Sequence, residues 1–201
     1  MTEILVGYLA KLHLTRAGWI SPWADHPDCG FPCGPPVEEI CSVSNCIARK
    51  HRDPADSGAE NPFCLFDDPE VAWGMVPSES RGRSALFAYR LWPLQFDEGD
   101  QEEIDLWWEP ALGPLPDTFA CLGWDAVVGG NQHCFGCSPL SCNSGSDLVR
   151  CPELNRYCLV DDRQTALELA HRFSISQPEP GPYCAVQVWR ELRTIEYLAP
   201  S

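Results

Sequence analysis

Apolar positions in this chain fall into short segments that suit strands better than long helices. The run from Glu3 to Leu9 is almost wholly apolar and predicts a short, mostly buried strand, and Asp125 to Gly129 predicts a counterpart later in the chain. Ala85 to Trp92 and Tyr183 to Trp189 alternate imperfectly between apolar and polar residues. We expect these two segments to be closing strands, one at the end of each half of the chain.

One helix is expected before each closing strand. Apolar residues at helical spacing predict the longer helix and give it one apolar face; they are Ala166, Leu167, Leu169, Ala170 and Phe173. A smaller group that stops before Pro77 predicts the shorter helix; it contains Val71, Ala72, Met75 and Val76. Each helix is expected to begin at an Asp-Asp pair, whose second member (Asp68 or Asp162) caps the first turn. Pro69 suits the first helical position.

An internal repeat is the strongest signal in the chain. Residues 61–68 (NPFCLFDD) return as residues 155–162 (NRYCLVDD), with five of the eight positions identical. The hexapeptide C-S-x-x-x-C occurs at 41–46 and again at 137–142, at nearly the same offset. We therefore expect a tandem duplication.

The segments together predict an α+β fold made of two related halves. Each half is expected to follow the order β, Cys-rich loop, β, α, β, in which the second strand is the aromatic-Cys-Leu run at 63–66 or 157–160. The first half spans 1–96, and the second spans 117–201. We expect the halves to pack as one compact, pseudosymmetric unit.

An acidic, Pro-rich linker at 97–116 separates the two halves. Six of the nine residues at 97–105 are acidic. Such a segment is typical of a solvated spacer, and it would also suit a docking strip for a basic partner. After it, Asp117 to Leu122 predicts one further helical turn.

Net charge narrows the classes of partner. The 201 residues carry a formal charge of −15. Binding to the phosphate backbone of DNA or RNA depends on Lys and Arg, so nucleic acid is not an expected partner. An anionic membrane surface is excluded for the same reason, and no apolar run reaches the roughly 20 residues that span a bilayer. The charge does fit attraction to a basic protein.

The start of the chain and the cysteines bear on location. Charged or polar side chains interrupt the segment from Met1 to Ile20, which therefore lacks the apolar core of a secretory signal; they are Glu3, Lys11, His13 and Arg16. We expect a cytoplasmic protein. In that compartment thiols stay reduced, so the 12 cysteines are expected to bind metal or perform chemistry rather than form disulfides.

Two arrangements of cysteines could hold a metal. In the shared arrangement, which we favour because the duplication preserves it, the two hexapeptides meet across a pseudo-twofold axis and close one site with Cys41, Cys46, Cys137 and Cys142. In the local arrangement each half has its own site: Cys29, Cys33, Cys41 and Cys46, with His26 in reserve, and Cys134, Cys137, Cys142 and Cys151. Residues 134–137 have the C-x-x-C spacing of a zinc knuckle. Four sulfur ligands favour a structural Zn²⁺, with an iron–sulfur cluster as the alternative.

The cysteines also allow interpretations without metal. They could pack as small apolar residues, which is the expectation for Cys64 and Cys158 because each lies inside an apolar run. A thiol-dependent enzyme or redox protein would use Cys137 or Cys142, with His133 as its base. Capping explains the Asp-Asp pairs without catalysis. The chain contains no P-loop, G-x-G-x-x-G, H-E-x-x-H or G-x-S-x-G pattern.

These observations predict a non-enzymatic protein-interaction module with a Cys-ligated structural metal. An acidic inhibitor or immunity-type protein that covers a basic target would have this charge, this linker and no catalytic signature. The alternative is the thiol enzyme or redox protein with Cys137, Cys142 and His133.

Overall fold

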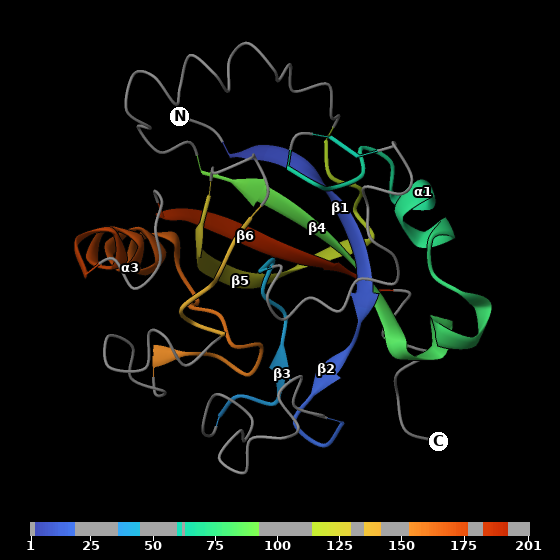
Figure 1. The fold of residues 1–201 in the computed structure, drawn as a ribbon, viewed down its shortest axis with the longest axis horizontal. Coiled ribbons are helices and arrows are strands. Elements are labelled where there is room, and N and C mark those ends of the chain that lie inside the picture. Colours follow the sequence, from blue (N-terminus) through green and yellow to red (C-terminus); the bar gives the residue numbers. More distant parts are fainter. Residues whose placement is uncertain are drawn as a thin grey trace.

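An antiparallel sheet of four strands forms the centre of the computed structural model (Figure 1). The structure describes residues 3–18, 36–44, 60–61, 63–92, 114–129, 135–141, 153–176 and 183–192. The strand order is β1-β4-β6-β5; the bounds are β1 Ile4–Leu12, β4 Ser84–Leu91, β5 Phe119–Val128 and β6 Tyr183–Glu191. Two short strands, β2 (Leu14–Thr15) and β3 (Glu39–Ile40), pair separately below this sheet.

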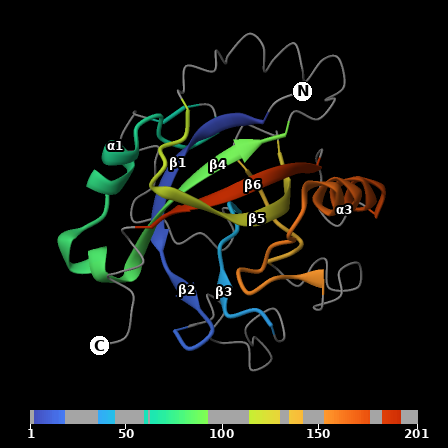
Figure 2. The same cartoon turned by 180° about the vertical axis from the view of Figure 1, so that it is seen from behind.

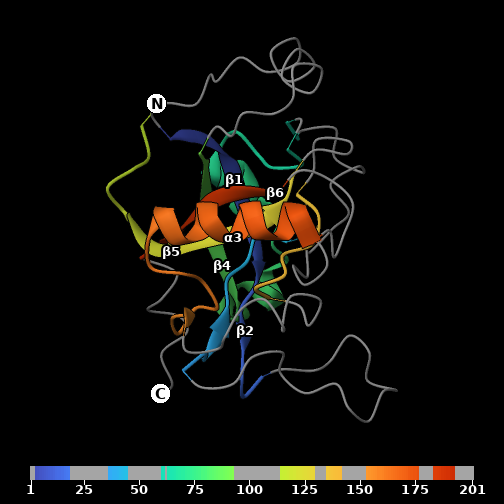
Figure 3. The same cartoon turned by 90° about the vertical axis from the view of Figure 1, so that its left-hand side faces the viewer.

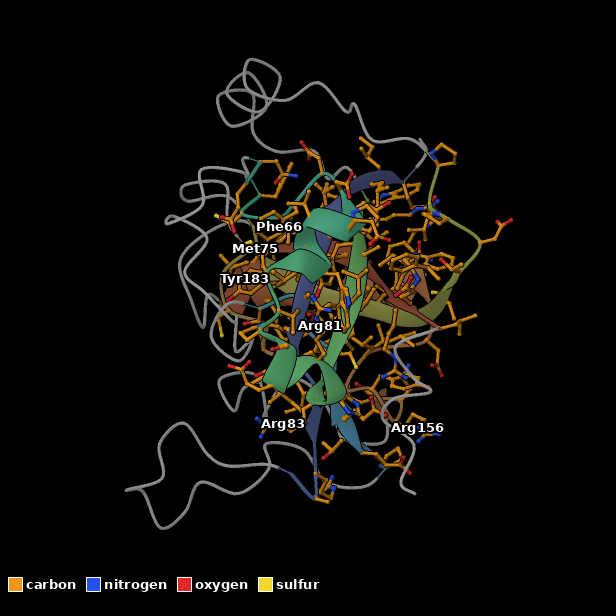
Figure 4. All side chains as sticks on the ribbon, turned by 90° about the vertical axis from the view of Figure 1, so that its right-hand side faces the viewer. Phe66, Met75, Arg81, Arg83, Arg156 and Tyr183 are labelled. Carbon is orange, nitrogen blue, oxygen red and sulfur yellow. The ribbon has the colours of Figure 1, made fainter. Side chains whose placement is uncertain are left out.

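Helices lie at opposite ends of the sheet (Figures 1 and 2). The short helix α1 (Pro69–Gly74) packs against β1 and β4, and the 3-10 helix η2 (Ser78–Arg83) follows it. The longer helix α3 (Arg163–Ser176) packs against β5 and β6 and crosses in front of them in Figure 3. Figure 4 shows the other end, with α1 and η2 in front of the sheet and Arg83 and Arg156 near its lower edge.

The helix predictions are largely confirmed. α3 buries four of the apolar positions that predicted it: Ala166, Leu169, Ala170 and Phe173. α1 begins with Pro69 at its first turn and ends before Pro77. Ala72 of this helix and Val76 after it are buried, whereas Val71 is 45% exposed. A six-residue helix has room for only one buried stripe, and Ala72 occupies it.

The mixed α+β character and the two closing strands, β4 and β6, are also confirmed. The predicted helical turn at Asp117 to Leu122 is wrong, because β5 already begins at Phe119 and pairs with Glu191 of β6. Likewise, β1 extends beyond Leu9 to Leu12. In both places the pairing with a neighbouring strand decides the backbone, and that pairing leaves no periodic signal in the local sequence.

The repeated octapeptides, 61–68 and 155–162, were expected to contain strands at 63–66 and 157–160. These strands do not form. Each run is a tight loop in which only the last residue joins the sheet, through the bridges Tyr8–Phe66 and Trp124–Val160. The cysteine in the middle of each loop has a positive φ, 57° at Cys64 and 61° at Cys158. A strand cannot contain such a residue, and an apolar run gives no warning of it.

An asparagine side chain organises the first loop. Asn61 donates from Nδ2 to the Val6 carbonyl at 2.7 Å and to Asp67 Oδ1 at 2.8 Å. Its Oδ1 accepts from the backbone N–H groups of Phe63 at 3.0 Å and Leu65 at 3.3 Å. The loop is therefore closed by side-chain hydrogen bonds to the backbone, which compete with strand pairing.

Asn155 makes the corresponding contacts in the second loop. Its Nδ2 donates to the Leu122 carbonyl at 2.9 Å and to Asp161 Oδ1 at 2.9 Å. Its Oδ1 accepts from the N–H groups of Tyr157 at 2.9 Å and Leu159 at 3.3 Å. The two octapeptides thus share one hydrogen-bond pattern.

Each asparagine side chain contacts a strand at a β-bulge that contains a glycine. The register of β1 shifts between Leu5 and Gly7, and that of β5 shifts between Cys121 and Gly123. Gly7 has φ +142° and Gly123 has φ +139°. A Cβ on Gly7 would lie 2.6 Å from the Leu65 side chain, and one on Gly123 would lie 2.7 Å from the Val160 carbonyl oxygen. Both positions require glycine for conformation and for space.

Candidate functional site

A buried carboxylate, Asp125 of β5, joins two distant segments of the chain. Its side chain accepts hydrogen bonds from Ser42 Oγ and Ser138 Oγ, each at 2.5 Å, and from the Val43 backbone N–H at 3.2 Å. Ser42 and Ser138 are the serines of the two C-S-x-x-x-C hexapeptides, and both are buried, as is Asp125. We call residues 41–44 the first Cys-Ser segment and residues 135–141 the second.

Each Cys-Ser segment also contacts the repeated octapeptide (61–68 or 155–162) that lies farther from it in sequence. Cys41 of the first segment donates its backbone N–H to the Tyr157 carbonyl at 3.1 Å. In the second segment, the ring of Phe135 stacks on Phe63 with 5.7 Å between centroids. The described parts of both segments therefore contact Asp125 and also the octapeptide that is more distant in sequence.

Lys11, near the end of β1, supplies the positive charge beside this carboxylate. It is 2% exposed, and its ammonium donates to the Ser42 carbonyl. Nζ lies 4.5 Å from the centre of the Phe87 ring. Burial lowers the pKa of Lys11 to about 8, against the effect of Cys41 and Asp125, which raise it. Burial also raises the pKa of Asp125, while its hydrogen bonds from Ser138 and Ser42 oppose that shift.

A second charged cluster centres on Glu39 of β3. Its Oε2 lies 2.7 Å from His13 Nε2 and 2.6 Å from Arg190 Nη1, and it accepts from the Cys41 thiol at 3.8 Å. Although burial raises the pKa of Glu39, the hydrogen bond from His13 and the charge of Arg190 lower it to about 2. The guanidinium of Arg190 also lies 5.2 Å from the centre of the Tyr157 ring.

These two clusters decide the chemistry of Cys41, the predicted metal ligand between them. The residue is 0% exposed, and burial together with the charge of Glu39 raises the pKa of its thiol to about 12. A thiol with such a pKa stays protonated at neutral pH and is a poor nucleophile. Of its neighbours, Lys11 donates to the Ser42 carbonyl, and Glu39 pairs with His13 and Arg190.

The structure describes only part of each predicted metal site. Of the favoured shared set, Cys41 and Cys137 are described and buried, whereas Cys46 and Cys142 lie outside the described residues. So do the members of the local sets that the shared set lacks, Cys29, Cys33, Cys134 and Cys151, and the reserve ligand His26. Within the described ranges, no group of three or more His, Cys, Asp or Glu side chains could hold a metal ion. The structural Zn²⁺ therefore stays a prediction.

The cysteines of the two octapeptides differ from each other. Cys158 is fully buried, as predicted, and its thiol donates to the Leu140 carbonyl at 3.1 Å. Cys64 is only partly buried and is disulfide-bonded, so the prediction of a simply buried thiol was wrong there. His133 and Cys142, which the thiol-enzyme alternative needs, lie outside the described residues.

The second aspartate of each Asp-Asp pair caps a helix, as expected. Asp68 Oδ1 accepts from the N–H groups of Glu70 at 2.7 Å and Val71 at 3.2 Å. Asp162 accepts from the Thr165 N–H at 2.9 Å and the Thr165 hydroxyl at 2.7 Å. Both caps are confirmed.

Sequence reasoning missed the charged residues that organise the interior. Lys11 was counted only as a break in a possible signal segment, and Asp125 only as the first residue of a strand. Glu39 and Arg190 were not singled out. Lys11 and Asp125 each interrupt an otherwise apolar run, and that interruption was the available signal, since a buried charge needs a partner.

Comparison with known proteins adds no assignment. The chain matches no family model, and neither the curated proteins nor the solved structures show significant similarity to it. Among the residues that the structure describes, no helix is long and apolar enough to cross a membrane.

Proposed function

We propose that the protein is a non-enzymatic interaction module, built from two copies of one ancestral unit, that binds a basic protein partner. The observation that carries this proposal is that the charged and thiol side chains around Asp125 and Glu39 are buried. Lys11, Glu39, Cys41 and Asp125 are all buried and engaged with neighbouring groups. A catalytic site needs such groups to reach a substrate, whereas a binding scaffold needs them only to hold its segments in place.

Support for the two copies comes from the octapeptides. Asn61 and Asn155 make matching sets of four hydrogen bonds, and each donates to the bulge residue before a glycine with positive φ. Both loops then lead into an aspartate-capped helix and a strand of the central pair, β4 or β6. One ancestral β-loop-α-β unit that was copied would explain this agreement, together with the repeated Cys-Ser segments.

Support for a basic partner comes from charge. The net charge is −15, and six acids fall within nine residues of the linker at 97–105. Complementary charge speeds the encounter of two proteins and selects against acidic competitors. An inhibitor or immunity-type protein that covers a basic surface would use the linker in this way.

Two variants of equal net charge test the role of the linker. The first neutralises four linker acids by Asp97→Asn, Glu98→Gln, Asp100→Asn and Glu102→Gln; the matched control carries Glu70→Gln, Glu79→Gln, Glu153→Gln and Glu168→Gln. Binding to a poly-lysine probe is measured by calorimetry at low and at physiological salt. The proposal expects the linker variant to lose more affinity than the control. Equal losses would mean that affinity follows net charge alone, and the linker would not be the binding strip.

Reactivity of the thiols tests the enzyme alternative. Burial raises the pKa of Cys41, Cys121 and Cys184, which favours unreactive thiols. Labelling of the folded protein with iodoacetamide is therefore expected to be slow at the buried Cys41 and Cys184, and the exposed Cys121 serves as the internal reference. One rapidly modified thiol at Cys137 or Cys142 would instead support the thiol enzyme.

The metal content of the protein and its cellular location are two further, separate proposals. One Zn²⁺ per chain would support the shared site of Cys41, Cys46, Cys137 and Cys142, and two per chain would support the local sites. The cytoplasm stays our prediction for the location of the protein. The disulfide at Cys64 weighs against that location, since disulfides persist mainly in oxidising compartments.

A further inference from the structure

The interior beside Asp125 contains a hydroxyl group that is buried and unsatisfied. Tyr89 of β4 is 0% exposed, and its Oη has no hydrogen-bond partner in the described part of the chain. The Tyr89 ring stacks on Phe87 with 6.3 Å between centroids, and Lys11 Nζ lies 5.9 Å from the centre of the Tyr89 ring. The phenol and the ammonium therefore share one compartment. Buried hydroxyls are rarely left without a partner.

Among the residues that the structure describes, the partners of Lys11 do not use its full hydrogen-bonding capacity. Its ammonium carries three N–H donors, of which one reaches the Ser42 carbonyl. None of the ion pairs between described residues involves Lys11, so its nitrogen lies more than 4.0 Å from the Asp125 carboxylate. The two buried charges therefore do not touch directly, although each affects the other.

The carboxylate of Asp125 completes the compartment. Burial, and after it the negative charge of Asp125, raise the pKa of Tyr89, and the same charge opposes the lowering of the pKa of Lys11. Asp125 therefore acts on both Tyr89 and Lys11. Asp125 accepts three hydrogen bonds, and a carboxylate has about four acceptor positions.

We propose that this compartment binds one water molecule, which accepts hydrogen bonds from Lys11 Nζ and Tyr89 Oη and donates one to Asp125. Buried waters typically make about three hydrogen bonds to otherwise unsatisfied groups, and these side chains offer that number. The charges select the ligand. Asp125 repels a small anion and Lys11 repels a cation, whereas a neutral molecule that both donates and accepts suits all three groups. The water links β1, β4 and β5 at the point where both Cys-Ser segments are held.

Tyr89→Phe tests the proposal because the two possibilities give opposite signs. If water satisfies the hydroxyl, removing it breaks a hydrogen-bond network, and the folding equilibrium constant falls about two- to tenfold. If the hydroxyl has no partner, its removal relieves a buried unsatisfied group and raises stability. The midpoint of urea unfolding is the readout. A midpoint that is unchanged or higher in the variant would overturn the proposal.

A count of internal water molecules gives an independent reading. Oxygen-17 magnetic relaxation dispersion detects waters that stay bound for longer than the protein tumbles. We expect Tyr89→Phe to lose one such water relative to the parent protein. The control, Tyr183→Phe, removes a buried hydroxyl from the other apolar cluster and is expected to keep the count. An equal count in Tyr89→Phe and the parent protein would show that the bridging water is absent. Neither result depends on the partner suggested above.

Discussion

The two octapeptide loops have the same hydrogen bonds and different surroundings. Asn61 and Asn155 hold their loops in the same way, and Gly7 and Gly123 receive them at equivalent bulges. Beyond these shared contacts the two loops differ. The first leads into a helix of 6 residues and has a disulfide-bonded cysteine, and the second leads into a helix of 14 residues and buries its cysteine.

The difference separates residues that set the backbone from residues that adapt to their neighbours. Asparagine, glycine and the capping aspartate make local hydrogen bonds or permit unusual φ values, so their role is the same at both loops. The cysteine and the helix length depend on what packs against the loop. Four pairs of substitutions at corresponding positions test this separation.

The largest effect is expected at the bulge glycines. Gly7→Ala and Gly123→Ala would each force a Cβ to within 2.7 Å of existing atoms at a φ near +140°. Backbone strain and overpacking together should cost about 3 kcal/mol or more in the free energy of unfolding. Chemical denaturation provides the measurement.

Gly74→Ala is the matched control for both glycines, because nothing lies within 4 Å of a Cβ there and its φ is not in the positive region. That substitution should be neutral or stabilising by up to about 1 kcal/mol. If one bulge glycine tolerated alanine as well as Gly74 does, the two bulges would not be equivalent.

Next in size are the asparagines. Asn61→Ala and Asn155→Ala each remove four hydrogen bonds and leave two loop N–H groups without their acceptor. A loss of about 2–4 kcal/mol is expected at each position. Asn→Asp keeps the acceptor but puts a carboxylate oxygen against Asp67 or Asp161 and a backbone carbonyl, so it should destabilise at least as much as alanine in thermal unfolding. A large loss in one loop and none in the other would contradict the shared hydrogen-bond pattern.

A smaller effect is expected at the serines on Asp125. Ser42→Ala and Ser138→Ala each remove one hydrogen bond of 2.5 Å to a buried carboxylate. Each should cost about 1.5–3 kcal/mol, which is the range for a hydrogen bond to a charged group. The double variant should lose more than the sum of the single ones if the carboxylate then lacks both donors. Additive losses would show that the two Cys-Ser segments are held independently.

The smallest effect is expected at the helix caps. Asp68→Ala should cost about 1 kcal/mol through the lost bonds to Glu70 and Val71. Asp162→Ala should cost more than Asp68→Ala, because Asp162 also accepts from the Thr165 hydroxyl and starts the longer helix. Circular dichroism during thermal unfolding distinguishes the two. The reverse order would mean that helix length does not govern the value of the cap.

Sequence patterns predicted the parts of the fold that depend on local chemistry. The capping aspartates, the buried stripe of α3 and the closing strands β4 and β6 follow from residues within one turn or a few positions along a strand. The loops at Cys64 and Cys158 did not follow, because apolar side chains surround a backbone that Asn61 and Asn155 hold in a tight turn. The clusters around Asp125 and Glu39 did not follow either. Their partners come from distant segments, as in the bond from Ser42 to Asp125.

The strand order β1-β4-β6-β5 has a consequence for how the chain is made. In the four-stranded sheet the partners closest along the chain are Val128 and Tyr183, and every other pair is farther apart. Such non-local pairing slows folding. During synthesis β1 has to wait for β4, and the two central strands cannot join until Tyr183–Glu191 has left the ribosome. The nascent chain therefore spends most of its translation with open strand edges, and a chaperone that shields them should raise the yield of folded protein.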